Sequence, residues 1–112
     1  MSDKVEINDK VKIIAKHYGY HLQKEQAIEE MAELTLAIKK LEKVKVSSID
    51  FNIKHTNLIE EIADVSIMMM QLTELTDSVA VSKIINEKLD RQLNRIKEEE
   101  KMLWFRKYLL FW

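Results

Sequence analysis

Almost nothing in this sequence would interrupt a helix. Gly19 is the only glycine among the 112 residues, and there is no proline. Residues that are common in helices dominate the rest of the chain, so the composition predicts an all-α fold. The length is that of one domain. We therefore expect a single domain over residues 1–112, with its core at about 9–100.

The spacing of apolar residues divides the chain into four expected helices. The first starts behind Asn8 or Asp9, which are good N-caps, and ends at Gly19 in the left-handed conformation. The second covers about 22–44, and the turn-forming residues at 45–57 predict a long loop after it.

The third expected helix starts at Asn57, which forms a capping-box pattern with Glu60, and runs to about Leu75. A turn at 76–78 precedes the fourth helix. The apolar residues of the two central helices predict buried stripes: Ala27, Met31, Leu34, Ile38 and Leu41 in one, and Leu58, Ile62, Val65, Met69 and Leu72 in the other. Such stripes are typical of a four-helix bundle.

Charge and cysteine content exclude several classes of function. The net charge is −1, with both signs abundant, so no basic field indicates nucleic-acid binding. Without cysteine there is no disulfide, no thiolate metal site and no thiol nucleophile. The polar N-terminus lacks the apolar core of a signal peptide. We expect a soluble cytoplasmic protein that does not bind membranes.

One acidic motif occurs twice, as "EEMAEL" at 29–34 and as "EEIADV" at 60–65. Residues three apart share a helix face, which groups Glu30 with Glu33 and Glu61 with Asp64, each pair beside an apolar stripe. A single motif of this kind usually reflects solvated surface charge. If the two stripes pack together, however, four carboxylates repel one another and require a cation between them. Oxygen ligands without His or Cys favour Mg²⁺, or alternatively Mn²⁺.

The pattern E-x-x-E, a spacer, then E-x-x-D resembles the signature of the all-α nucleoside triphosphate pyrophosphohydrolases, the MazG-like superfamily. The sequence around this pattern, over roughly residues 18–97, is most similar to that of small bacterial or phage MazG-like proteins. The resemblance implies hydrolysis of a (d)NTP to (d)NMP and pyrophosphate, as in house-cleaning of the nucleotide pool. It also implies that the four carboxylates bind the metal and form the catalytic centre: Glu30, Glu33, Glu61 and Asp64.

A polyphosphate needs cationic partners, and the fourth expected helix carries Lys88, Arg91 and Arg95 at spacings of three and four. The resemblance implies phosphate contacts for them, and a place near the base or sugar for Asn94 and Gln26. The alternative is a solvated basic face paired with neighbouring acids.

Other functions stay open at this point. The substrate could be phosphoribosyl-ATP, or the chain could be a non-enzymatic helical interaction module. A ferritin-like di-metal protein needs Glu-x-x-His pairs, and neither acidic motif has a histidine at that place. His17 and His21 flank Gly19, and we expect no ligand role for them.

The end of the chain, residues 101–112, is rich in apolar side chains. It holds five of the eight aromatic residues and is too short to span a bilayer. We expect a helical tail that packs on the core or on another subunit. A membrane-surface anchor is the weaker alternative. The wide apolar faces favour a homodimer or a homotetramer.

Overall fold

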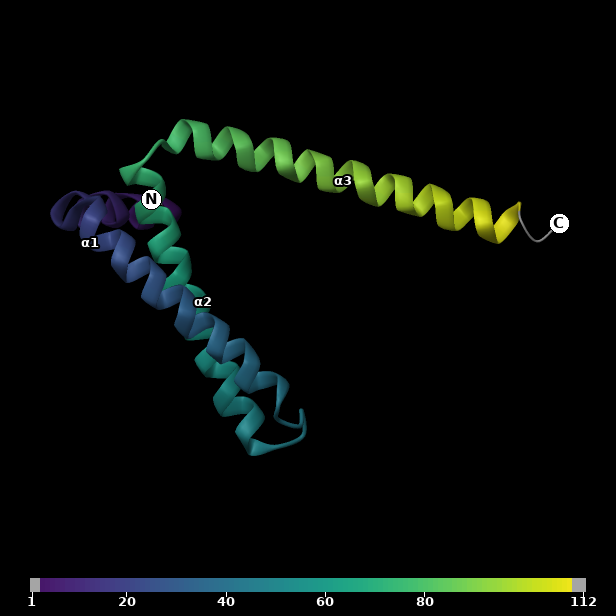
Figure 1. Cartoon of the computed structure of the whole chain (residues 1–112), viewed down its shortest axis with the longest axis horizontal. Helices are drawn as coiled ribbons and strands as arrows, with labels where there is room; N and C mark the ends of the chain where they lie inside the picture. The colour runs from purple at the N-terminus through teal and green to yellow at the C-terminus, as the bar shows by residue number, and fades with distance from the viewer. Residues whose placement is uncertain (1–2, 110–112) are drawn as a thin grey trace. The chain divides into compact units, whose positions relative to one another are not determined.

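The computed structural model describes residues 3–109, which form three helices and no strand (Figure 1). These are α1 (Asp3–Glu42), α2 (Ile49–Leu75) and α3 (Ser78–Tyr108). The predicted all-α class is confirmed. None of the described helices combines the length and the apolar character needed to cross a membrane. The chain divides into two compact units, Met1–Asp77 and Ser78–Trp112.

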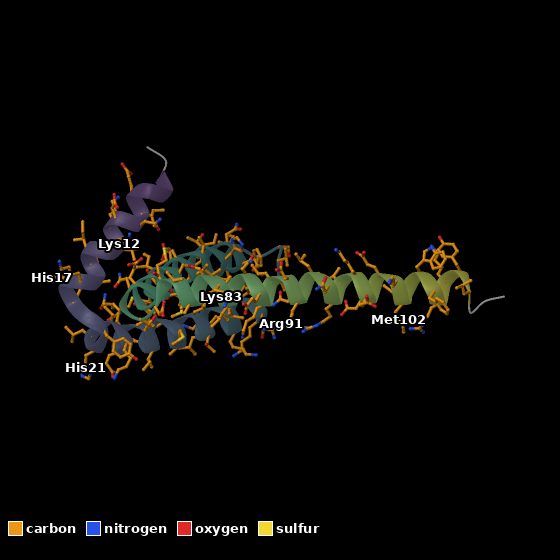
Figure 2. The ribbon with its side chains drawn as sticks, turned by 90° about the horizontal axis from the view of Figure 1, so that it is seen from above. Lys12, His17, His21, Lys83, Arg91 and Met102 are labelled. Atoms are coloured by element: carbon orange, nitrogen blue, oxygen red, sulfur yellow. The ribbon has the colours of Figure 1, made fainter. Side chains whose placement is uncertain are left out.

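Helix α1 is broken at Gly19, where φ is 79° and ψ is 169°. That combination is open to glycine and strained for other residues. A Cβ atom at this position would meet nothing within 4 Å, so the need for glycine is conformational. The predicted break is confirmed, although the backbone is not in the left-handed helical conformation that was expected. His17 and His21 lie on either side of the break, and both are exposed (Figure 2).

The predicted starts of two helices are wrong. Helix α1 already begins at Asp3, and Asn8 and Asp9 lie inside it, because the polar residues before them are also compatible with a helix. Helix α2 begins at Ile49, so the connection is much shorter than the predicted loop at 45–57.

Ser48 explains the early start of α2. Its Oγ accepts a hydrogen bond from the backbone N–H of Phe51 at 3.1 Å and donates one to the carbonyl of Lys45 at 2.7 Å. A serine oxygen that satisfies a free N–H group of the first turn is a strong N-cap. Asn57, the predicted cap, lies within α2.

The first unit is built by packing α1 against α2, and the two helices are antiparallel (Figure 1). Gln23 donates a buried side-chain hydrogen bond to Gln71, which joins the helices near the start of α1's second half and the end of α2. Glu30 and Glu33 meet Glu61 further along both helices. These contacts fix the register that brings the two acidic motifs together.

The contact seam between α1 and α2 contains six of the ten residues of the predicted stripes and differs from them at the other four. Its buried and half-buried residues repeat at spacings of three and four, as helix packing requires: Gln23, Ala27, Glu30, Leu34, Ala37 and Leu41 on α1, and Leu58, Glu61, Val65, Met68 and Leu72 on α2. The predicted core positions Met31, Ile38, Ile62 and Met69 are exposed, at 42%, 43%, 49% and 38%.

The small alanines of α1 account for the difference. They lie in the row of α1 that faces α2, and they let the backbone of α2 approach closely. Ala27 and Ala37 are 1% and 2% exposed, which places them at the closest part of the contact. Glu30 and Glu61 consequently lie in the seam itself rather than beside it.

The second unit is α3, an uninterrupted helix of 31 residues. From Ser82 to Leu109 every residue is exposed. The helix includes residues 101–108 of the apolar tail. Phe111 and Trp112, which belong to the predicted tail, lie outside the described residues.

Candidate metal centre

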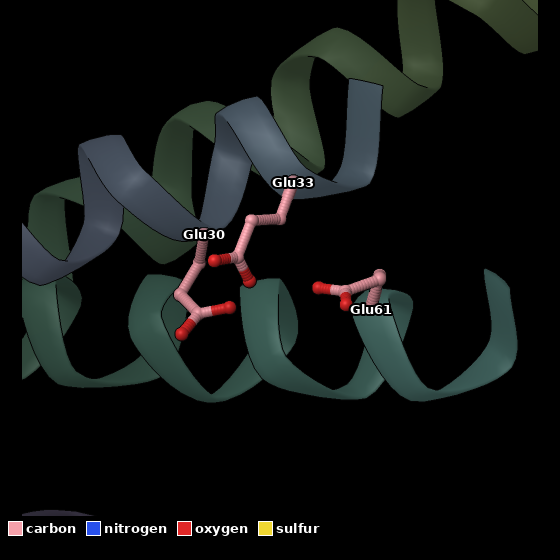
Figure 3. A group of neighbouring side chains, drawn as sticks. All are labelled: Glu30, Glu33 and Glu61. Carbon is pink, nitrogen blue, oxygen red and sulfur yellow. The ribbon is translucent and has the colours of Figure 1, made fainter. Parts of the chain in front are cut away.

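Three of the four predicted carboxylates converge between α1 and α2. Glu30 and Glu33 come from α1 and Glu61 from α2, and one oxygen of each lies within 4.8 Å of the others (Figure 3). Glu30 and Glu61 are half-buried, and Glu33 is exposed. Among the side chains that the structure describes, this is the only group of three or more acidic or histidine residues close enough to share a cation.

Two oxygens of this group are buried without a hydrogen-bond partner among the described residues. They are the Oε2 atoms of Glu30 and Glu61, one on each helix. A buried carboxylate oxygen without a donor or a cation is costly, because it has lost its hydration and gained nothing in return. Both oxygens are therefore suited to bind a cation.

Gln26 holds the other oxygen of Glu30. Its Nε2 donates a hydrogen bond of 2.8 Å to Glu30 Oε1 across one turn of α1. One oxygen is thus oriented by an amide, while the second remains available. A hydrogen bond that fixes a ligating carboxylate is a common supporting contact in metal sites. In this structure Gln26, predicted to contact the nucleoside, contacts a carboxylate.

The electrostatics of the group act on Glu33. Repulsion from Glu30 is the largest effect, and it raises the pKa of Glu33 above its ordinary value. Four smaller effects raise this pKa further, in decreasing order: reduced hydration, repulsion from Glu61, a hydrogen bond with Glu30 and repulsion from Glu29. A raised pKa means that the ionised form is unfavourable without a compensating positive charge. A divalent cation would supply that charge.

The remaining acids of the two motifs lie outside the group. Asp64, the fourth predicted ligand, is exposed on α2, three residues beyond Glu61. Glu29 and Glu60 are also exposed. The structure therefore brings together three carboxylates from two helices.

The predicted cationic residues share one face of α3. Lys88, Arg91 and Arg95 line a shallow hollow together with Gln92, and Figure 2 labels Arg91 on this helix. None of the three cations forms an ion pair with another described residue. Asn94 is exposed on α3 and does not line the hollow.

Some structural partners were not predicted. Gln23 and Gln71 form the buried hydrogen bond of the seam, at 7% and 3% exposed, and Gln92 lies between the cations of α3. Residue spacing indicates the position of two of them, because residues four apart share a helix face. Gln23 precedes Ala27 by four residues, and Gln92 follows Lys88 by four. Both residues are polar, so apolar periodicity does not identify them.

The arrangement offers hard oxygen ligands on two helices, in a half-buried seam, without histidine or thiolate. Such a set suits Mg²⁺ or Mn²⁺ better than zinc or copper. Comparisons of the chain with protein-family models, curated proteins and solved structures gave no significant match.

Proposed function

We propose that this chain is a Mg²⁺-dependent nucleotide pyrophosphohydrolase that converts a (d)NTP to (d)NMP and pyrophosphate. The observation that carries the proposal is the meeting of Glu30, Glu33 and Glu61 in the α1–α2 seam. The sequence pattern of the two motifs, which resembles that of the MazG-like superfamily, adds the reaction class.

The three carboxylates fit a hard divalent cation. Two buried oxygens lack a partner among the described residues, and the pKa of Glu33 is raised by its acidic neighbours. When bound, Mg²⁺ or Mn²⁺ would neutralise charge on a polyphosphate and lower the pKa of water, which is the chemistry that phosphoanhydride hydrolysis needs.

The chain's own residues then have distinct roles. Glu30 and Glu61 hold the cation from opposite helices, and Gln26 keeps the Glu30 carboxylate in place through its hydrogen bond. Glu33 completes the group from the exposed side. Asp64 is proposed as a further ligand on the sequence pattern alone.

The proposal assigns phosphate binding to Lys88, Arg91 and Arg95, and a base or sugar contact to Asn94. Their support is positive charge that no described acid pairs with, together with the resemblance of this helix to that of the superfamily. Arginine and lysine on one helix face are well suited to phosphate oxygens.

The proposal also includes a homodimer or homotetramer with a MazG-type bundle, located in the cytoplasm. Its support is the exposed apolar row of the first unit: Met31, Ile38, Ile62 and Met69. Large apolar side chains that remain exposed on a helix pair are typical of protein interfaces.

The experiment is a substrate panel. The protein is incubated with Mg²⁺ and each common or damaged (d)NTP, and with phosphoribosyl-ATP, while pyrophosphate and orthophosphate are followed separately. We expect pyrophosphate from at least one substrate, a large loss in Glu61→Gln, and near-normal turnover in Glu60→Gln, which removes an adjacent exposed charge from the same helix. Orthophosphate alone, or no turnover across the panel, would overturn the proposal in favour of a helical interaction module.

A further inference from the structure

The last turns of α3 differ from the rest of the helix in their side chains. We define the aromatic segment as residues 101–109. Trp104, Phe105 and Tyr108 are 56%, 51% and 47% exposed. The ring centroids of Trp104 and Tyr108 lie 5.3 Å apart. The Lys107 Nζ lies 5.4 Å from the centroid of the Tyr108 ring. Large aromatic rings are therefore presented on the surface together with cations.

The segment has two unlike sides. A helix turns about 100° per residue, which groups most of the apolar side chains on one side: Met102, Trp104, Phe105, Tyr108 and Leu109. Arg106 and Lys107 fall on the opposite side, with Leu103 as the apolar residue between them, whereas Lys101, the first residue of the segment, falls on the apolar side. An apolar aromatic side opposite a cationic side is the pattern of helices that lie in a membrane interface.

The charge of the segment selects the partner. It contains Lys101, Arg106 and Lys107 and no acidic residue, although the whole chain has a net charge of −1. A second copy packed parallel and in register would bring like charges together, whereas an anionic surface complements the three cations directly. Three consecutive glutamates at 98–100 precede the segment, so the part of α3 that could face an anionic surface begins at Lys101.

The kinds of apolar residue also fit a lipid surface. Tryptophan and tyrosine concentrate at the level of the headgroups, where one edge of the ring is apolar and the other meets water. The helical part of the segment, residues 101–108, is only about 12 Å long at about 1.5 Å per residue. It would therefore lie in the plane of the interface.

We propose that the aromatic segment binds the surface of membranes that contain anionic phospholipids. Met102, Trp104, Phe105, Tyr108 and Leu109 enter the boundary between headgroups and acyl chains, and the cations contact the headgroup phosphates. This inference is independent of the metal centre, because none of these residues takes part in it.

The test uses the full chain and its own fluorescence. Both tryptophans, Trp104 and Trp112, belong to the apolar end of the sequence, so tryptophan emission reports on that end alone. The protein is mixed with phosphatidylcholine vesicles, with or without about 30% phosphatidylglycerol, and binding is also measured by co-flotation. We expect a blue shift and co-flotation with the anionic vesicles, both weakened by added salt.

Two double variants separate the segment's charge from general charge. Each cation near an anionic surface contributes about fivefold in affinity, so Arg106→Gln with Lys107→Gln is expected to weaken binding about 25-fold. The control, Lys39→Gln with Lys83→Gln, removes two exposed cations elsewhere and should change binding less than about twofold. Circular dichroism verifies that each variant remains helical.

A third variant tests the apolar side. Trp104→Ser with Phe105→Ser should abolish co-flotation while the helix content is kept. Equal binding to neutral vesicles, or no binding to anionic vesicles, would overturn the proposal. So would a blue shift that appears without vesicles as the protein concentration rises, because a second copy would then be the partner.

Discussion

Replacing Glu61 by glutamine should make the metal-free protein more stable and remove its response to Mg²⁺. Glutamine keeps the shape of the side chain and removes the only charge that α2 contributes to the carboxylate group. Glu61 Oε2 is buried without a hydrogen-bond partner among the described residues, so a neutral group is also easier to desolvate there.

The geometry sets the size of the effect. Oxygens of Glu30 and Glu61 lie within 4.8 Å of each other. Two like charges at that separation repel by about 1 kcal/mol even in a medium as polar as water. Removing this repulsion should raise the melting temperature by about 4 °C for a chain of this size. Repulsion from Glu33 acts in the same direction.

Mg²⁺ should reverse the order of stability. At one hundred times its Kd a ligand that binds only the folded state stabilises it by about 2.7 kcal/mol, which exceeds the gain from removing the repulsion, and the variant should not gain this. Thermal melts followed by circular dichroism, in EDTA and in a Mg²⁺ series, measure both effects. Glu60→Gln is the matched control, because it removes an exposed charge next to Glu61 on the same helix.

Two results would refute this reasoning. One is a Glu61→Gln protein that melts below the wild type in EDTA, which would mean that the three carboxylates do not repel one another in the folded state. The other is an equal Mg²⁺-induced shift in wild type, Glu61→Gln and Glu60→Gln, which would place the cation elsewhere.

Three further perturbations test other parts of the structure. Because the pKa of Glu33 is raised, the folded state binds the proton of this carboxyl more tightly than the unfolded state does. In the absence of metal, the free energy of unfolding should therefore fall as the pH rises from the ordinary pKa of 4.5 through the raised pKa, and it should be higher near pH 5 than at pH 7. Melts in EDTA should show this slope in wild type and a smaller one in Glu33→Gln; equal slopes would contradict the cause given. Gly19→Ala should cost about 1–3 kcal/mol in chemical denaturation, because alanine is strained at the φ of 79°, and unchanged stability would show that the break is not needed. Gln71→Leu should lower the free energy of unfolding by about 1–3 kcal/mol, because it leaves Gln23 buried without its partner. The double variant Gln23→Leu with Gln71→Leu should have a free energy of unfolding closer to that of wild type. A double variant that is less stable than Gln71→Leu alone would argue against this pairing.

The sequence was sufficient to predict the helical class, the break at Gly19 and the approach of the two acidic motifs. These follow from strong local signals: scarce helix breakers, one glycine, and repeated three- and four-residue spacings. The start of α2 was not predicted, because both Ser48 and Asn57 can cap a helix. Ser48 is the cap because its hydroxyl forms hydrogen bonds with the backbone of both Lys45 and Phe51. These contacts depend on the folded backbone and cannot be recognised from the residue type.

The composition of the seam was not predictable from one helix at a time. Met31 and Ala27 both belong to the predicted stripe, and only contact with α2 determines that Ala27 is buried and Met31 is exposed. The same choice of row moved Glu30 and Glu61 into the seam, which makes the carboxylate group more buried than the pattern alone suggested. Asp64 shows the limit of a spacing argument, since a residue three positions from Glu61 is still exposed outside the group.

The most direct test of the proposed metal centre is a crystal structure of the protein soaked in Mn²⁺, with anomalous differences measured. The account predicts an anomalous peak between α1 and α2, within about 2.0–2.6 Å of oxygens from both Glu30 and Glu61. A peak at another position, or no peak between these two helices at a saturating Mn²⁺ concentration, would contradict it.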